Sequence, residues 1–144
     1  MKKALLLLFI LMLAAVCAAC GGSTKDVSID YGASELYTQE DMDTAIALIE
    51  KEFKDWKGCE LHSISYAGDQ CQSADTVDWM NQLKEGQNIS GPEFTQVICF
   101  VSDFHSPKNS ADAQAFNVDQ EYTDWQWWLA RSDGGKWKLL TWGY

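Results

Sequence analysis

The sequence predicts an α+β domain in which a long N-terminal helix packs on a curved, four-stranded antiparallel sheet. Apolar residues recur at helical spacing over 38–58, and residues 122–144 have the pattern of two strands joined by a tight turn. The chain has 144 residues, of which 47% are apolar and 22% charged, a composition that suits one globular domain. The expected order of elements is helix, strand, short helix and three strands.

The long helix is predicted from its start signal, its apolar face and its end. Thr38 is followed three residues later by Asp41, which is the spacing of a capping box. Gly58 ends the segment, and Lys54 and Lys57 lie in its last turn, where basic side chains are favourable. One face of the helix carries apolar residues at helical spacing: Met42, Ala45, Ile46, Ile49, Phe53 and Trp56.

The middle of the chain predicts two strands and a second helix. Residues 61–66 and 93–103 are typical of strands, and the second of these is rich in Val, Ile and Phe. Residues 75–83 predict a short helix with Asp75 as its cap. A polar stretch over 105–120 follows, which is long for a loop in a compact domain.

The C-terminal hairpin has a register that the sequence predicts. A two-residue turn at Gly134-Gly135 places Trp127 opposite Trp142 and Leu129 opposite Leu140, on the face expected to cover the helix. The outer face then carries Trp128, Ala130, Trp137 and Leu139. An apolar patch on an outer face is typical of a binding surface, so Trp128, Trp137 and Leu139 are the candidate binding residues.

The N-terminus has the pattern of a secretory signal that ends in a lipidation site. Met1-Lys2-Lys3 precedes an apolar run over 4–19, which is shorter than the roughly 20 residues of a membrane span. The following Cys17-Ala18-Ala19-Cys20-Gly21-Gly22 resembles a bacterial lipoprotein box, in which Cys20 takes the lipid. Cys17 is the less suitable site because bulky Val16 precedes it. An uncleaved signal anchor is the alternative interpretation.

These features divide the chain into a signal peptide at 1–19, a lipidated Cys20 with a flexible tether over 20–35, and a single α+β domain at 36–144. The expected location is the outer leaflet of a bacterial cell membrane, with the lipid as the membrane contact. Cleavage after residue 19 removes Lys2 and Lys3 and leaves 9 basic against 21 acidic side chains, a net charge of −12. This charge argues against a nucleic-acid partner and predicts that the domain stands off anionic lipid.

The helix pattern and the C-terminal segment also resemble a known family. The segment Trp128-Leu129-Ala130-Arg131-Ser132-Asp133-Gly134-Gly135-Lys136-Trp137-Lys138-Leu139 is similar to the closing strand pair of small Gram-positive extracytoplasmic lipoproteins with an NTF2-like (cystatin-like) domain. The resemblance implies that fold and no particular function, because such domains include enzymes, binding modules and interaction domains. It carries over no catalytic residue.

Three cysteines follow the predicted anchor, and three single pairings among them can be drawn. Cys59 and Cys71 are the favoured disulfide because they close a short loop that contains Gly68-Asp69-Gln70. Cys99 lies within an apolar run that predicts a buried strand, so we expect it to be a free core residue.

No nucleophile motif, phosphate-binding glycine loop or calcium-loop pattern occurs, and the sequence predicts no metal or cofactor. The leading hypothesis is therefore a non-enzymatic module that binds a ligand or an envelope protein, or forms a homodimer, through the sheet face. The alternative is a small NTF2-like enzyme in which Asp103 orients His105 as an acid–base pair, since residues two apart on a strand share a face.

Overall fold

The computed structural model describes residues 21–144. Its strands are β1 (Ser28–Asp30), β2 (Glu60–Tyr66), β3 (Gln96–His105), β4 (Glu121–Arg131) and β5 (Lys138–Gly143). Its helices are α2 (Gln39–Phe53), α3 (Ala74–Gly86) and the single turn α4 (Ser110–Ala113), with a short 3₁₀ helix η1 (Asp69–Cys71) between β2 and α3.

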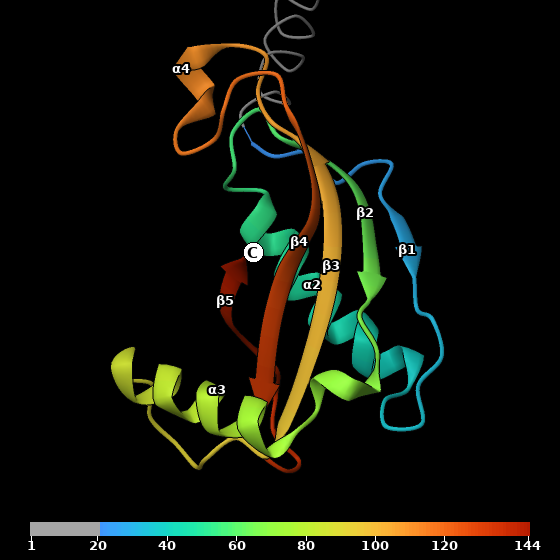
Figure 1. Ribbon diagram of the computed structural model, residues 1–144, viewed down its shortest axis with the longest axis vertical. Helices are drawn as coiled ribbons and strands as arrows, with labels where there is room; N and C mark the ends of the chain where they lie inside the picture. The colour runs from blue at the N-terminus through green and yellow to red at the C-terminus, as the bar shows by residue number, and fades with distance from the viewer. Residues whose placement is uncertain (1–20) are drawn as a thin grey trace, which may run out of the picture.

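The five strands form one mixed sheet in the order β1-β2-β3-β4-β5 (Figure 1). β1 runs parallel to β2, and the other neighbouring pairs are antiparallel. The predicted fold class, a four-stranded antiparallel sheet preceded by a long N-terminal helix, is therefore wrong. The extra strand comes from the segment before the helix, where three residues with polar neighbours gave no strand pattern.

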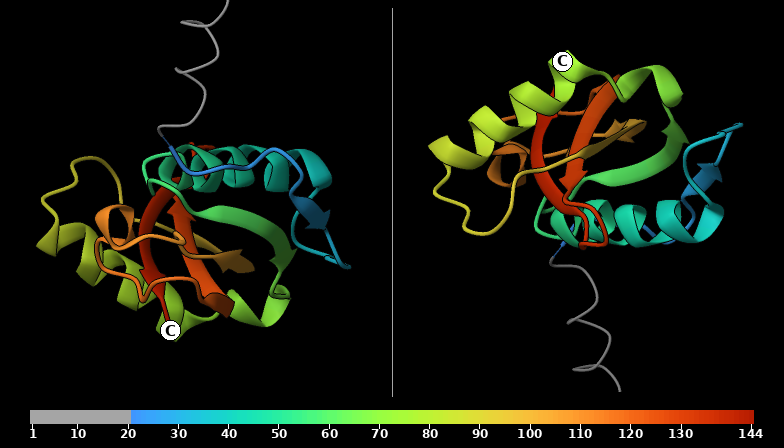
Figure 2. Two further views of the ribbon diagram at one scale, coloured as in Figure 1. Left: turned by 90° about the horizontal axis from the view of Figure 1, so that it is seen from above. Right: turned by 90° about the horizontal axis from the view of Figure 1, so that it is seen from below.

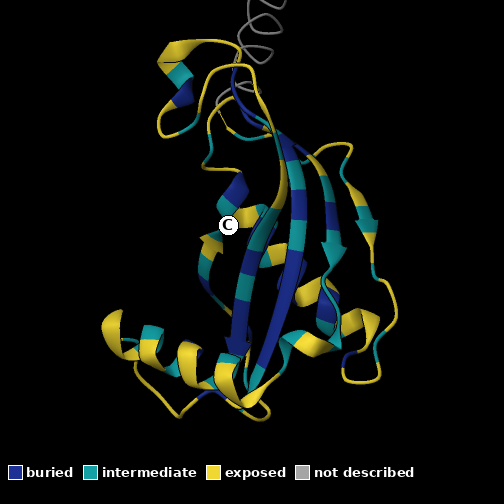
Figure 3. Cartoon of the chain, viewed as in Figure 1, coloured by how far each residue is buried: buried dark blue, intermediate teal, exposed yellow. Residues whose placement is uncertain are grey.

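The two longer helices cover opposite faces of the sheet (Figure 2). The larger core lies under α2 and includes its buried residues Met42, Ala45, Ile46, Ile49 and Phe53 together with Ile98, Phe100, Phe104, Trp127 and Leu129 of β3 and β4. The smaller core lies under α3 and consists of Met80, Phe94, Val97, Ala130 and Leu140. For this reason β3 is buried along most of its length, and β4 is buried toward its C-terminal end (Figure 3).

Helix α2 begins as expected and ends early. Thr38 caps it through the predicted capping box with Asp41. The helix ends at Phe53, and residues 54–58 form tight turns that return the chain to the sheet, with Gly58 at a φ of +75°. Trp56, expected on the helical face, instead lies after the helix and packs on the indole of Trp127 with ring centroids 5.1 Å apart.

Residues 21–35, expected to be part of a flexible tether, are attached to the fold. The Gly22 amide donates to the Lys54 carbonyl at 3.0 Å, and the Ser23 amide donates to the Cys59 carbonyl at 2.8 Å. The segment then forms β1 beside β2, and Ile29 packs against the larger core. The domain therefore includes the residues that directly follow Cys20.

The hairpin has the predicted register at one end and is shifted by one residue at the other. Trp127 pairs with Trp142 as expected, whereas Leu129 pairs with Leu139 in place of Leu140. The connection is longer than the predicted two-residue turn, since β4 ends at Arg131 and β5 begins at Lys138. A bulge on β5 absorbs the extra residue, and a shift of one residue moves side chains to the opposite face of a sheet.

Candidate functional site

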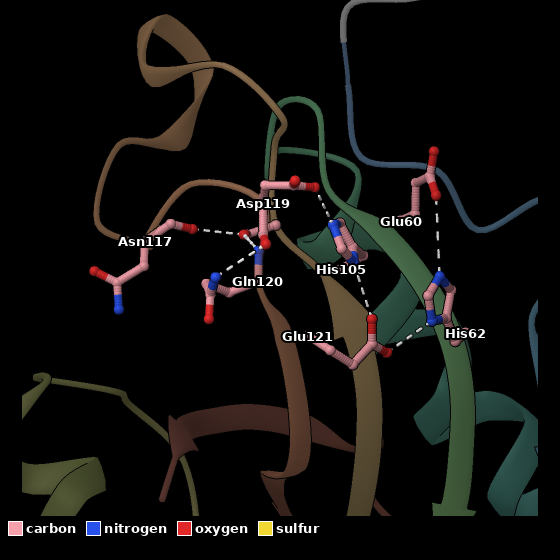
Figure 4. Close-up of polar contacts among 8 residues, drawn as sticks. Glu60, His62, His105, Asn117, Asp119, Gln120 and Glu121 are labelled. Atoms are coloured by element: carbon pink, nitrogen blue, oxygen red, sulfur yellow. Dashed lines mark hydrogen bonds and ion pairs between the residues drawn. The ribbon is translucent and has the colours of Figure 1, made fainter.

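Two histidines and three carboxylates form a chain of contacts at one end of the sheet (Figure 4). The Glu121 carboxylate lies between the two imidazole rings, with Oε1 2.8 Å from His62 Nδ1 and Oε2 3.0 Å from His105 Nδ1. Asp119 Oδ1 is 2.9 Å from His105 Nε2, and Glu60 lies 3.9 Å from His62 Nε2. The group joins β2, β3 and β4 where β3 ends.

This contact chain favours the protonated form of His105. Both ring nitrogens of His105 face carboxylate oxygens, and only the imidazolium form can donate to both. Asp119 and then Glu121 accordingly raise the pKa of His105 above its usual value. A histidine with both nitrogens engaged has no free nitrogen for a substrate, so the arrangement does not support general-base chemistry.

The predicted acid–base pair of Asp103 and His105 is not assembled. A register shift between Ser102 and Phe104 interrupts β3 at this point. Asp103 Oδ1 accepts the Asp124 amide at 3.1 Å, while His105 is held by carboxylates of the following loop and of β4. Within residues 21–144, no group of three or more His, Cys, Asp or Glu side chains has the geometry to hold a metal ion.

The predicted binding residues lie on different faces of the sheet. The shift in β5 turns Trp137 and Leu139 toward α2, where Trp137 is buried and donates Nε1–H to the Asp41 carbonyl at 3.1 Å. Trp128 stays on the face of α3 and packs edge-on against Trp79 with centroids 5.2 Å apart. The outer patch of Trp128, Trp137 and Leu139 therefore does not exist.

A different group of aromatic residues is exposed around the end of β5. We call Trp79, Trp128, Trp142 and Tyr144 the aromatic surface; together with Gln126, Thr141 and Gly143 they line a depression of about 150 Å³. Trp79, Trp142 and Tyr144 are 38%, 39% and 78% exposed, and they are three of the five large apolar residues exposed in the described chain. The sequence pattern predicts Trp142 in the core, and no sequence signal marks Trp79 or Tyr144 as exposed.

A larger cleft of about 440 Å³ lies between the start of α2 and the hairpin connection. Its half-buried cation is Arg131, whose Nη1 is 2.8 Å from Asp41 Oδ1 and whose guanidinium carbon is 4.2 Å from the Trp137 ring centroid. The charge of Arg131 is thus already neutralised by Asp41, and its flat face is already stacked. These contacts hold the hairpin to the helix and leave no unpaired guanidinium for a ligand.

The structure does not bring the favoured cysteine pair together. Cys59 precedes β2 and Cys71 follows it, so the seven residues of the strand, about 23 Å in extended form, separate them. All three thiols of the described chain are free. Cys71 instead lies beside Cys99, the residue expected to have no partner, and the two thiols shift each other's pKa.

The lipidation site, Cys20, and the predicted signal peptide lie outside the described residues. None of the helices within residues 21–144 is long and apolar enough to cross a bilayer.

No protein-family model, curated protein or solved structure matches this chain. None of these comparisons identifies the NTF2-like lipoprotein family, and the mixed five-stranded sheet differs from the fold expected of it.

Proposed function

We propose that this chain is an extracytoplasmic lipoprotein, held at the outer leaflet by lipid on Cys20, and that its domain is a non-enzymatic module that binds a protein partner. The aromatic surface is the observation that supports the binding of a protein partner. Trp and Tyr are enriched at protein interfaces and among the residues that dominate binding energy. In this protein three exposed examples gather around one depression.

The size of the depression favours a contact surface over a small-molecule pocket. Its volume of about 150 Å³ is below the roughly 300–1,000 Å³ typical of ligand pockets. A depression of this size accommodates one side chain of a partner, with the surrounding rings covering its neighbours. A protein surface fits this description better than a free metabolite.

The charge around the aromatic surface selects a neutral or basic partner. Asp78 directly precedes Trp79 on α3, and Asp124 lies two residues before Gln126 on β4; both aspartates are exposed. The segment after residue 19 carries a net charge of −12, so an acidic partner would be repelled. The same negative charge disfavours self-association, because two copies of the domain would repel each other. We therefore propose that the partner at the aromatic surface is a different protein.

The binding half can be tested by photo-crosslinking in intact bacterial cells that make the protein. With a photoreactive amino acid in place of Tyr144, we expect a discrete crosslinked product that Trp79→Ala removes. The control is Leu36→Ala, which truncates another exposed apolar side chain, 51% exposed, outside the aromatic surface. A product unaffected by Trp79→Ala, or no product at all, would contradict the proposal.

The anchor half has its own matched pair of variants. We expect Cys20→Ala to lose lipid and to leave an uncleaved precursor or a released domain, whereas Cys17→Ala should be processed and lipidated normally. Membrane fractionation and intact mass measure both outcomes. Lipid retained on the Cys20→Ala protein would refute the assignment.

A further inference from the structure

We infer that Cys71 and Cys99 form a disulfide that fastens η1 and the start of α3 to the central strand β3, while Cys59 stays reduced. The pairing depends on contacts inside the domain. Only the oxidising compartment in which the bond would form rests on the proposed anchor. The experiment below therefore tests the pairing whether or not Cys20 carries lipid.

The backbone after β2 folds back along β3 and brings residue 71 beside residue 99. The Ala67 amide donates to the Cys99 carbonyl at 3.0 Å, which continues the β2–β3 ladder by one step. Gly68, at a φ of +110°, then reverses the chain into η1. Directly after η1, Gln72 Nε2 donates to the Thr95 carbonyl at 3.0 Å, so the returning chain runs beside β3.

The position of Cys71 is fixed on both sides. Its amide donates to the Gly68 carbonyl at 3.2 Å, and its carbonyl accepts from Thr76 Oγ1 at 2.7 Å, at the start of α3. Cys99 is 2% exposed and lies in the middle of β3. Both cysteines are therefore held in place before any bond forms, so closing the bond would order few additional groups.

The two thiols have different acidities, which assigns their chemical roles. The nearby Cys99 thiol lowers the pKa of Cys71, whereas the Cys71 thiol and then burial raise the pKa of Cys99. Cys71 is also half-buried where Cys99 is buried, so an external oxidant reaches Cys71 first. Cys71 is thus the attacking thiolate, and Cys99 is the resolving thiol.

The oxidant is a disulfide compound, such as oxidised glutathione or a disulfide oxidoreductase. The Cys71 thiolate attacks one sulfur of that disulfide, forms a mixed disulfide and expels the other sulfur as a thiolate. Cys99 then loses its proton and attacks the Cys71 sulfur, which forms the Cys71–Cys99 bond and expels the second thiolate. The protein loses two electrons and two protons, and the oxidant is reduced to two thiols.

Peptide mapping of the full chain, oxidised with oxidised glutathione, tests the pairing directly. Trypsin leaves Cys59 and Cys71 together in peptide 58–84, and a glutamate-specific protease separates them by cutting after Glu60. Without reduction, we expect peptide 61–84 joined to the peptide that contains Cys99, two hydrogen atoms lighter than their sum. A bridge to Cys59, or alkylated Cys71 and Cys99 in the folded oxidised protein, would overturn the inference.

Serine and alanine variants provide a second measurement. The proposed bond closes the loop between residues 71 and 99. Because such a bond constrains the unfolded chain, we expect reduction to lower the melting temperature of the oxidised protein by about 10 °C. Cys59→Ser should retain this difference, and Cys71→Ser and Cys99→Ala should each abolish it. Equal sensitivity of the Cys71→Ser protein and the unmodified chain to reduction would contradict the assignment.

Discussion

Three tryptophans of the hairpin differ in environment although they are close in sequence. Trp127 is fully buried, and its Nε1–H donates to Ser102 Oγ at 2.9 Å. Trp137 is 6% exposed and lies against Tyr37 and Arg131. Trp142 packs on the Trp127 indole but is 39% exposed, because β5 is the edge strand. Burial therefore separates Trp142 from the other two.

Alanine variants should reproduce this division in the free energy of unfolding. Trp127→Ala and Trp137→Ala should each cost about 3–5 kcal/mol, as large aromatic deletions in cores do. Trp142→Ala should cost about 1 kcal/mol, because much of the ring is already in water. Urea unfolding of the three proteins measures these differences, and equal costs for Trp137 and Trp142 would contradict the bulge on β5.

The protonation of His105 is a second property that belongs to single residues. Asp119 contributes most to the raised pKa of His105, and Asp103 makes its hydrogen bond elsewhere. Asp119→Asn should therefore lower the pKa of His105, and Asp103→Asn should leave it unchanged. An NMR titration of the imidazole protons measures both pKa values. A larger effect of Asp103→Asn than of Asp119→Asn would support the acid–base pair of Asp103 and His105 instead.

The raised pKa also predicts how stability depends on pH. His105 binds its proton more tightly in the folded state than in the unfolded state, where the pKa is about 6.5. The resulting stabilisation is complete below that pH and is lost as pH rises through the folded pKa. Melting temperatures across this range should decline in the unmodified chain and decline less in His105→Gln.

At the scale of elements, the start of α2 connects the helix to the hairpin. The Asp41 carboxylate accepts from the Thr38 amide and from Arg131 of β4, and the Asp41 carbonyl accepts from Trp137. The Arg131 guanidinium is the main cause that lowers the pKa of Asp41, and the hydrogen bonds from Thr38 lower it further. Asp41, the partner of the N-cap residue Thr38 in the capping box, thus also positions the loop between β4 and β5.

Removing the cap alone should have a modest cost. Thr38→Ala deletes the hydroxyl that accepts from the Asp41 amide at 3.1 Å, and loss of such a cap costs about 1 kcal/mol. Thr38→Ser retains the hydroxyl and should be near neutral. Asp41→Ala should cost more than Thr38→Ala, because it also leaves Arg131 without its carboxylate. Chemical unfolding of the three variants would expose a reversed order.

Elements with strong local signals could be predicted from the sequence. The capping box at Thr38, the apolar periodicity of α2 and the residue type of β3 each depend on neighbours within a few positions, and each appears in the structure. The bulge on β5 could not be predicted, because it depends on how Leu139 and Leu140 divide between two cores. The predicted position of Trp137 and Leu139 on the outer face of the sheet is therefore wrong.

The same limit applies to the candidate sites. Trp79 and Tyr144 are far apart in sequence and meet only because α3 returns beside the end of β5. Cys71 and Cys99 meet because η1 folds back along β3. No local sequence pattern predicts either contact. The pattern that predicts lipid on Cys20 is contained in six consecutive residues, and it stays a prediction because Cys20 lies outside the described residues.

At the scale of the whole molecule, the fold begins almost at the proposed anchor. A Cβ at Gly22 would collide with the Phe53 carbonyl oxygen, and one at Gly21 would lie 2.5 Å from the Lys54 carbonyl oxygen. Both glycines thus allow the N-terminal segment to lie flat against the end of α2. The backbone bonds of Gly22 and Ser23 then hold β1 in register.

Gly22→Ala should therefore release this segment without unfolding the domain. We expect faster trypsin cleavage after Lys25 and lost amide protection over β1, since the close approach to α2 is blocked. Gly86→Ala is the control because no atom lies within 4 Å of the added methyl group. Unchanged cleavage at Lys25 in the Gly22→Ala protein would show that the segment is not held by this contact.

The early start of the fold also determines what the domain can reach. If Cys20 carries lipid, as we propose, only Gly21 separates it from the hydrogen bond between Gly22 and Lys54, so the domain would turn about a point at the bilayer surface. Helix α3 lies at the opposite end of the sheet from residue 21, and β3 alone spans about 33 Å (Figure 1). Under the proposed anchoring, Trp79 would therefore stay within a fixed distance of Cys20, set by the length of β3, and would meet only partners that come within that distance of the bilayer.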